Sequence, residues 1–162
     1  MRDVQIETDV EMHIPDNYVS NIQERLNLYT KLNKISSEED LEQFEKMLDD
    51  RFGDVPKQVY ELFDAMRLRQ TCKELGFERV ILKSSKLRLY FISNPQATYF
   101  DSQTFQDLMS FVTVQGAKHG LSLKQTPKYF MLIKPGVHTL KSTKAVLDLL
   151  EKEVLGKGVE TA

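Results

Sequence analysis

The chain has 162 residues, of which 41% are hydrophobic and 28% are charged, with a net charge of −2. These values exclude a disordered chain and are typical of a globular domain with its own core. The single Cys72 excludes an internal disulfide and a cysteine-built zinc cage, and no apolar run reaches the roughly 18 residues that span a bilayer. We therefore expect a soluble, cytoplasmic protein that makes no membrane contact.

The first elements are an extended arm and a helix. Apolar and polar side chains alternate over residues 4–14, which predicts a strand or extended arm with one buried face that ends at Pro15. A helical period follows over 18–35. It places Ile22, Leu26 and Tyr29 on one apolar stripe, with Leu28, Leu32 and Ile35 beside it.

Two more helices follow in the first half. Residues 36–39, Ser-Ser-Glu-Glu, predict a capping box that begins the second helix. Its buried stripe is Leu41, Phe44 and Leu48, and Gly53 suits the left-handed position just after it. We predict that Asp54 caps a third helix, which runs to about residue 75 with an apolar stripe wide enough for burial on two sides.

The second half changes to short β-prone runs. Runs at 77–82 and 86–92, split by Ser84-Ser85, predict a hairpin. A helix over 102–118, strands at 121–125 and 128–134, and a last helix over 139–154 complete the pattern. Residues 157–162 are expected to form a disordered tail.

These elements predict an α+β fold. It has an N-terminal extended arm or strand and a three-helix region, followed by a small mixed or antiparallel sheet of two strand pairs with two further helices. We expect one domain over 1–156, composed of an arm (4–15), a helical half (16–76) and a strand-and-helix half (77–155).

The near-neutral net charge conceals two segments of opposite sign. Residues 37–54 hold eight acids against two bases, whereas 118–144 hold six lysines and no acid. Each segment could prefer a partner of the other sign, or each could be a solvated face only. A nucleic-acid-binding module that uses the basic C-terminal half, including Tyr129 and Phe130, is therefore an alternative interpretation.

The sequence shows no pattern for catalysis or cofactor binding. Phosphate-binding glycine loops and the nucleophile elbow are missing, and His13, His119 and His138 lack metal-ligand spacing. Cys72 falls on the core side of the third helix. We predict no catalytic residue, cofactor or metal in this chain.

The stretch 48–56, LDDRFGDVP, raises the question of an acidic site. At 3.6 residues per turn, the side of the second helix opposite its buried stripe holds Glu39, Glu42, Lys46 and Asp50. Asp49 flanks this side and Met47 borders it. Because these acids point outward and not into a cleft, we predict a partner-binding surface and not a catalytic site.

The first half resembles a known family over residues 4–77. The resemblance is carried by Ile14-Pro15, Tyr18, Arg25-Leu26 and Tyr29, and then by the DRFG-x-x-P element, which supplies Arg51, Phe52, Gly53 and Pro56. This pattern is similar to the C-terminal domain of the bacterial transcription-repair coupling factor family. Leu48, Phe52, Gly53 and Pro56 are expected to build the structural corner between the second and third helices, and Arg51 and Asp54 are expected to serve that corner.

The resemblance implies a regulatory and non-catalytic role. The parent protein would be an ATP-driven, helicase-like DNA translocase that displaces stalled RNA polymerase and recruits UvrA for nucleotide excision repair. ATP, Mg²⁺ and DNA would be bound by other domains of that parent. The C-terminal domain would pack on the N-terminal UvrB-like module of the same chain, cover the UvrA-binding surface and restrain the motor.

The resemblance also implies that acids before DRFG contact basic residues of the UvrB-like module. Asp50 occupies a matching position, whereas Met47 stands where an acid is implied. Glu42 and Asp49 are the alternative carriers of that charge.

Overall fold

The computed structural model describes residues 3–156, and these residues form two compact units. One unit holds the chain up to Val10 and from Leu68 onward, and the other is Glu11–Arg67. The boundary lies within the long helix α3 (Lys57–Leu75), so this helix contributes to both units. The N-terminal strand and Leu68–Leu75 thus group with the residues of the sheet.

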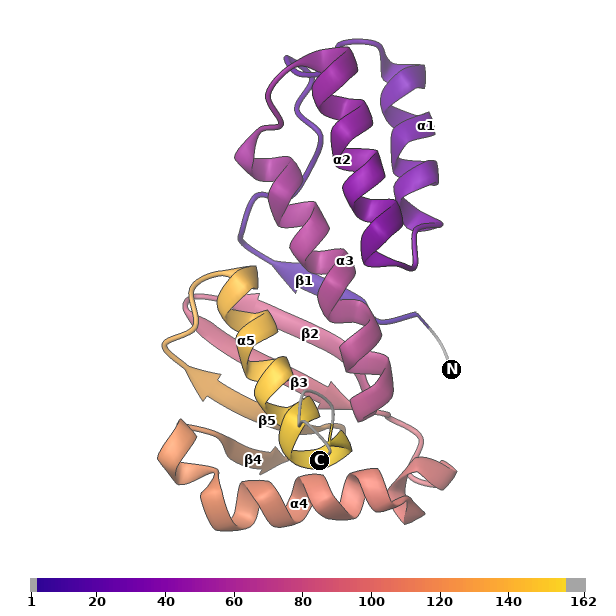
Figure 1. Ribbon diagram of the computed structural model, residues 1–162. Helices are drawn as coiled ribbons and strands as arrows, with labels where there is room; N and C mark the ends of the chain where they lie inside the picture. The colour runs from indigo at the N-terminus through magenta and orange to yellow at the C-terminus, as the bar shows by residue number, and fades with distance from the viewer. Residues whose placement is uncertain (1–2, 157–162) are drawn as a thin grey trace. The chain divides into compact units, whose positions relative to one another are not determined.

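The unit Glu11–Arg67 is helical. It contains α1 (Ile22–Asn33), α2 (Glu38–Phe52) and the first turns of α3 (Figure 1). The side chain of Asn21 accepts a hydrogen bond from the Glu24 amide, so α1 begins later than the predicted residue 18. Ser37 caps α2 by accepting from the Asp40 amide, which corrects the predicted capping box by one residue.

The core of this unit is apolar and closely packed. Its buried side chains come from the arm and from all three helices: Ile14, Val19, Leu28, Leu32, Leu41, Phe44, Leu48, Val59 and Phe63. The prediction that Ile22 and Leu26 are buried was wrong, since they are 67% and 54% exposed. Leu28 faces the core, and Leu26 lies about 200° around the helix from it.

The other unit is built on a five-stranded sheet of order β1-β2-β3-β5-β4. β2 (Phe77–Lys83) and β3 (Lys86–Phe91) form the predicted hairpin, and Ser84 and Ser85 both have positive φ in its turn. β4 (Ser122–Gln125) and β5 (Phe130–Pro135) form the second antiparallel pair, and β5 also pairs with β3. The α+β prediction is confirmed.

The N-terminal strand is shorter than predicted. β1 spans only Gln5–Thr8 and pairs in parallel with β2, which makes the sheet mixed. Beyond β1, the Asp9 carboxylate accepts a hydrogen bond from the Ser84 amide at 3.0 Å, and Ile14 is buried in the core of the helical unit. The alternation over 4–14 therefore serves two different cores, with Val4 buried in the sheet unit.

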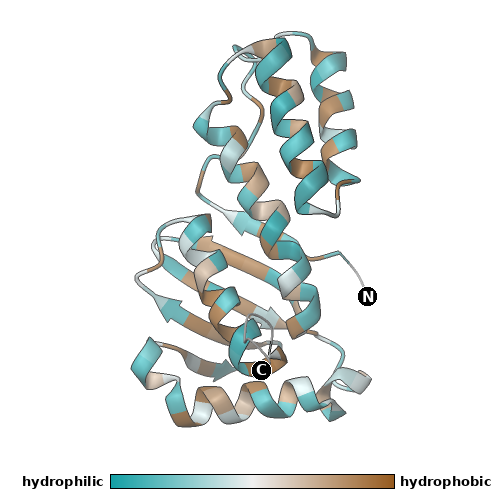
Figure 2. Ribbon diagram, in the orientation of Figure 1, coloured by the Kyte–Doolittle hydropathy of each residue, from teal (hydrophilic) through white to brown (hydrophobic). Residues whose placement is uncertain are grey.

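Two helices and several short turns complete the sheet unit. α4 (Gln103–Gln115) is capped by Ser102 and α5 (Leu140–Leu150) by Thr139, both close to prediction. Short helical turns lie at Thr98–Asp101, Ala117–His119 and Glu151–Leu155. Figure 2 shows the alternating hydrophobic and hydrophilic residues along the strands. The predicted disordered tail, 157–162, lies outside the described residues.

No helix within residues 3–156 is both long enough and apolar enough to cross a membrane.

Candidate functional site

The predicted partner-binding residues lie on α2. Glu39, Glu42, Lys46, Asp49 and Asp50 are all exposed, while Leu41, Phe44 and Leu48 on the opposite side are buried. We call the four carboxylates and Lys46 the acidic face of α2. None of these four carboxylates makes a hydrogen bond or ion pair with another residue in the described part of the chain.

Other acids of the helical unit have internal partners. Glu38 forms an ion pair with the Arg67 guanidinium at 2.7 Å, which raises the pKa of Arg67. Glu45 accepts a hydrogen bond from the Tyr60 hydroxyl at 3.1 Å. Glu24 on α1 forms an ion pair with Arg51. The structure therefore separates acids that join helices to each other from acids that face solvent.

Met47 is less available for contact than the other predicted residues. It is partly buried, packs against the core of the helical unit, and lies 3.9 Å from an Arg51 nitrogen. Sequence reasoning missed a better exposed apolar pair in the same unit, Ile22 and Leu26 on α1. Their spacing of four residues places them on one side of the helix, but an apolar stripe in the sequence does not show which of two sides meets the core.

The DRFG-x-x-P residues form the corner between α2 and α3. The Tyr18 hydroxyl lies 2.8 Å from the Gly53 carbonyl oxygen and 3.1 Å from that of Leu48, so it ties the arm to the end of α2. Gly53 has φ +88°, which favours glycine, and its amide donates to the Asp49 carbonyl. The Arg51 guanidinium lies 4.9 Å from the centre of the Phe52 ring.

The start of α3 differs from the prediction. The Pro56 carbonyl accepts from the amides of Val59 and Tyr60, and α3 begins at Lys57. Pro56 therefore lies directly before the first helical residue. Asp54, the predicted cap, lies two residues earlier in the chain. A proline fits this position because its missing amide is not needed there.

Three further motif residues hold the arm and α1. Arg25 donates to the Val19 carbonyl at 2.7 Å, and Tyr29 accepts from the Ile14 amide through its hydroxyl at 2.7 Å. The Pro15 carbonyl accepts from the amides of Tyr18 and Val19. These bonds satisfy backbone groups that the irregular arm leaves without a strand or helix partner.

Tyr18 joins this corner to the acidic face. Burial raises the pKa of its hydroxyl, and the nearby Asp49 carboxylate raises it further. The hydroxyl therefore stays protonated at neutral pH and remains a donor.

The candidate catalytic and metal residues of the sequence do not come together. Within residues 3–156 there is no group of three or more His, Cys, Asp or Glu that could hold a metal ion. Cys72 is fully buried, and burial raises the pKa of its thiol to about 12, so it is a core residue without thiolate character.

The basic residues of the second half are divided between the strands and the helices. Arg79, Lys83, Lys86 and Arg88 lie on β2 and β3, Lys124 on β4 and Lys134 on β5, whereas Lys141 and Lys144 lie on α5. Tyr129 is 44% exposed, while Phe130 beside it is partly buried.

This architecture has a close counterpart among solved structures. The crystal structure of the C-terminal domain of a transcription-repair coupling factor superposes with a TM-score of 0.69, over 96% of each chain, at 18% sequence identity. The likeness covers both units and shows the fold: the chain is an α+β domain of this type.

The sequence places the chain in a family. The TRCF domain family matches residues 8–102, and the chain belongs to this family. The transcription-repair-coupling factor of Staphylococcus epidermidis is 29% identical over 96 residues, which are 59% of this chain and 8% of that protein. The one from Escherichia coli K12 is 32% identical over 78 residues, 46% of this chain and 7% of that protein. The matched segment thus spans less than a tenth of each relative.

Proposed function

We propose that this chain is the regulatory docking domain of a transcription-repair coupling factor. The relatives are named transcription-repair-coupling factor, and the fold is that of the C-terminal domain of such a factor. The acidic face of α2 binds a basic surface of the UvrB-like module in the same parent protein. Docking covers the UvrA-binding surface and restrains the ATP-driven DNA translocase until RNA polymerase is engaged.

One observation carries this proposal. Of the acids on α2, Glu38 and Glu45 are engaged within the helical unit, whereas Glu39, Asp40, Glu42, Asp49 and Asp50 are exposed and their carboxylates have no partner among the described residues. Glu39 and Glu42 lie three residues apart, and like charges at this spacing destabilise a helix by a few tenths of a kcal/mol. A basic partner surface removes that repulsion on docking.

The strength of such contacts suits a reversible restraint. Exposed ion pairs contribute about 0.2–1 kcal/mol each, so four of them give roughly 1–4 kcal/mol. Ile22 and Leu26 offer additional apolar area in the same unit. A restraint of this size yields to a competing partner that binds only the released state.

The test is charge reversal in the full-length parent protein. Glu42→Lys, Asp49→Lys and Asp50→Lys together should raise basal ATPase activity and allow UvrA to bind without RNA polymerase. The control reverses three exposed acids elsewhere, Glu11, Asp101 and Glu153, with the same change in net charge. If the α2 variant leaves both ATPase activity and UvrA binding at wild-type values, the acidic face is not the docking surface.

A further inference from the structure

The sheet has two faces of different character. The side chains of Val80, Leu82, Leu87 and Leu89 are at most 1% exposed, and α5 lies over this side of the sheet (Figure 1). Alternate residues along the same strands point the other way. The side chains of Arg79, Arg88 and Tyr90 lie on this second face. They are partly exposed, although β2 and β3 are inner strands of the sheet.

Strand register aligns the second face into rows. Gln5 pairs with Arg79, Arg79 with Tyr90, Tyr90 with Met131, and Met131 with Lys124, so one row crosses the whole sheet. The neighbouring rows add Arg88, Lys83 and Lys86. We call Arg79, Lys83, Lys86, Arg88, Tyr90 and Lys124 the basic sheet face. Glu7 is the carboxylate on it, paired with Arg79 at 2.9 Å and Lys83 at 3.8 Å.

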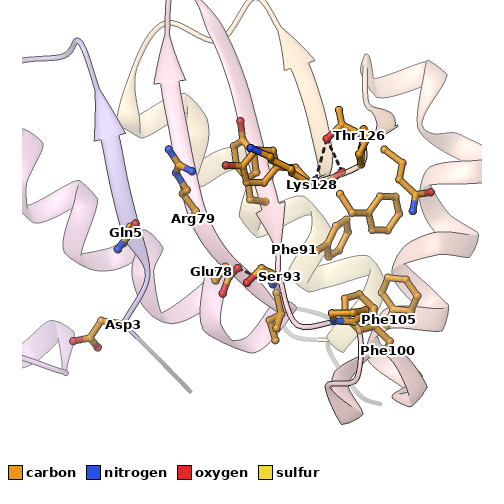
Figure 3. A pocket seen from close by; sticks show the side chains of 17 residues that line it. Asp3, Gln5, Glu78, Arg79, Phe91, Ser93, Phe100, Phe105, Thr126 and Lys128 are labelled. Atoms are coloured by element: carbon orange, nitrogen blue, oxygen red, sulfur yellow. Dashed lines mark hydrogen bonds between the residues drawn. The ribbon is translucent and has the colours of Figure 1, made fainter.

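A pocket of about 690 Å³ opens at one end of this face (Figure 3). It is formed where β2 begins, β3 ends and β4 connects to β5, and Phe100 and Phe105 also line it. Six aromatic rings are in its lining: Tyr90, Phe91, Phe100, Phe105, Tyr129 and Phe130. This volume falls within the range of sites for small ligands, which is roughly 300–1,000 Å³.

The rings have an ordered arrangement. Phe91 stacks on Phe130 with 4.8 Å between ring centres, and Phe105 meets Phe91 edge-on at 5.7 Å. Tyr129, which is 44% exposed, meets Tyr90 edge-on at 5.4 Å. Phe91 is only 2% exposed, so it supports the lining from beneath, and Tyr129 provides the solvent-accessible aromatic wall.

Polar groups in the pocket lining complement the rings. The Arg79 guanidinium lies 5.2 Å from the centre of the Tyr90 ring, and its Nε is buried without an acceptor among the described residues. Lys128 is exposed at the rim. The two carboxylates in the lining are engaged, because Glu78 accepts from the Ser93 amide at 2.7 Å and Asp3 pairs with Lys73 at 3.1 Å.

We propose that the basic sheet face and its pocket bind single-stranded DNA. One base enters the pocket and stacks on Tyr129, while backbone phosphates contact Arg79, Arg88, Lys124 and Lys128. Aromatic platforms beside a row of cations are the usual means of binding an unpaired strand. A paired base cannot enter such a pocket, and a peptide made of Asp and Glu alone has no flat ring to stack there. The choice of DNA over RNA rests on the proposed function.

The first test is a titration of the 162-residue chain with a fluorescently labelled 15-residue oligo-dT, followed by anisotropy. A single strand gives a slope of about −0.7 per phosphate contact in log affinity against log salt, so four contacts predict a slope near −2.8. Affinity should then fall about 50-fold between 50 and 200 mM salt. Failure to bind at 50 mM salt overturns the proposal.

The second test uses variants at the rings. Tyr129→Leu should weaken binding by roughly 5- to 100-fold, the range measured for lost base stacking, whereas Tyr129→Phe should bind within about twofold of wild type. Equal affinity of the Leu and Phe variants would show that stacking plays no part. Because Tyr129 is exposed, thermal melting of both variants should match the wild type and exclude misfolding as the cause.

The third test separates this face from general positive charge. Arg88→Glu with Lys124→Glu should abolish binding at 100 mM salt, while the matched double reversal of Lys118 and Lys141, two exposed lysines elsewhere, should weaken it less than about threefold. An equal loss of affinity in the two double variants would show that the DNA is attracted by the positive charge of the whole chain and not by this face. Unlabelled poly-glutamate, duplex DNA or oligo-U that competes better than oligo-dT would also refute the assignment.

This proposal and the docking proposal fail separately. Reversal of Glu42, Asp49 and Asp50 changes only the helical unit, so it should leave oligo-dT binding at or slightly above the wild-type affinity. Conversely, wild-type ATPase activity and UvrA binding in the α2 variant would refute the docking proposal and would leave the oligo-dT result standing.

Discussion

Replacement of Gly76 by alanine should strongly destabilise the sheet unit. Gly76 has φ +92°, a conformation that costs an L-residue about 1–2 kcal/mol. In addition, a Cβ at this position would lie 2.1 Å from two carbon atoms of the Tyr99 ring. Overpacking of this kind costs typically 1–3 kcal/mol, so we expect a total of roughly 2–5 kcal/mol.

Tyr99 cannot move aside easily. Its hydroxyl donates to the Leu75 carbonyl at 2.5 Å, and its ring contacts those of Phe100 and Phe105 at 5.4 Å between centres. Burial raises the pKa of this hydroxyl, as expected for a ring held in the core. The alanine methyl group must therefore displace a packed aromatic cluster.

A double-mutant cycle in urea, followed by far-ultraviolet circular dichroism, separates the two costs. In a Tyr99→Ala background the clash is removed, so Gly76→Ala should cost only the conformational strain, about 1–2 kcal/mol. The coupling between the two sites should be about 1–3 kcal/mol. Additive effects within about 0.5 kcal/mol would refute the close approach of this glycine and the ring.

Three further predictions concern stability. Burial raises the pKa of the Cys72 thiol to about 12, so the folded protein keeps the thiol protonated at a pH where the unfolded chain ionises it. The stability contributed by the protonated thiol is complete below the pKa of the unfolded chain and is lost as pH rises from there towards the folded pKa. The unfolding free energy should fall by up to about 1.4 kcal/mol between pH 9 and 10 in wild type, and Cys72→Ala should flatten this slope. Burial, with the nearby Asp64 carboxylate, raises the pKa of Glu61, whose buried oxygen has no partner among the described residues. Glu61→Gln should therefore raise Tm at pH 7 and leave it unchanged near pH 4, and an equal rise at both pH values would contradict this. Leu48→Ala, at a fully buried site, should cost about 2–5 kcal/mol in urea unfolding, whereas Leu26→Ala, at an exposed site, should cost less than about 1 kcal/mol.

Local sequence signals predicted the elements well. Serine at a helix start, glycine after α2 and the Ser84-Ser85 pair each act within a few residues, and the structure has a cap, a positive φ and a hairpin turn at these places. The errors also have local causes. Two adjacent serines precede α2, and either can accept from a helix amide; the capping-box pattern with Glu39 favoured Ser36, whereas the structure uses Ser37.

The sequence pattern did not predict which strands pair over long distances in the chain. β1 pairs with β2 across about 70 residues, and β3 pairs with β5 across a helix and two turns. Such contacts depend on how the complete set of apolar faces is satisfied, and periodicity reports only which side of one element is apolar. For the same reason the alternating arm gave no sign that its two ends join different units.

The same limit explains what the sequence showed of the two candidate surfaces. The helical wheel found the outward acids of α2, because one helix defines its own exposed side once Leu41, Phe44 and Leu48 are assigned to the core. It could not show that Glu38 and Glu45 are engaged by α3, since those partners lie in another helix.

The basic sheet face is harder to find, because it joins residues of the β2–β3 hairpin to a residue of β4, which is distant in the sequence. Arg79 pairs with Tyr90 within the hairpin, whereas Lys124 joins the same row only through Met131 of β5. The lysine-rich segment 118–144 is divided between the sheet and α5. The proposed interface includes Arg79 and Arg88 and leaves out Lys141 and Lys144, because these two lysines lie on α5. A net charge of −2 thus accommodates an acidic and a basic surface in separate units, and we expect a mutation in one surface to leave the other unchanged.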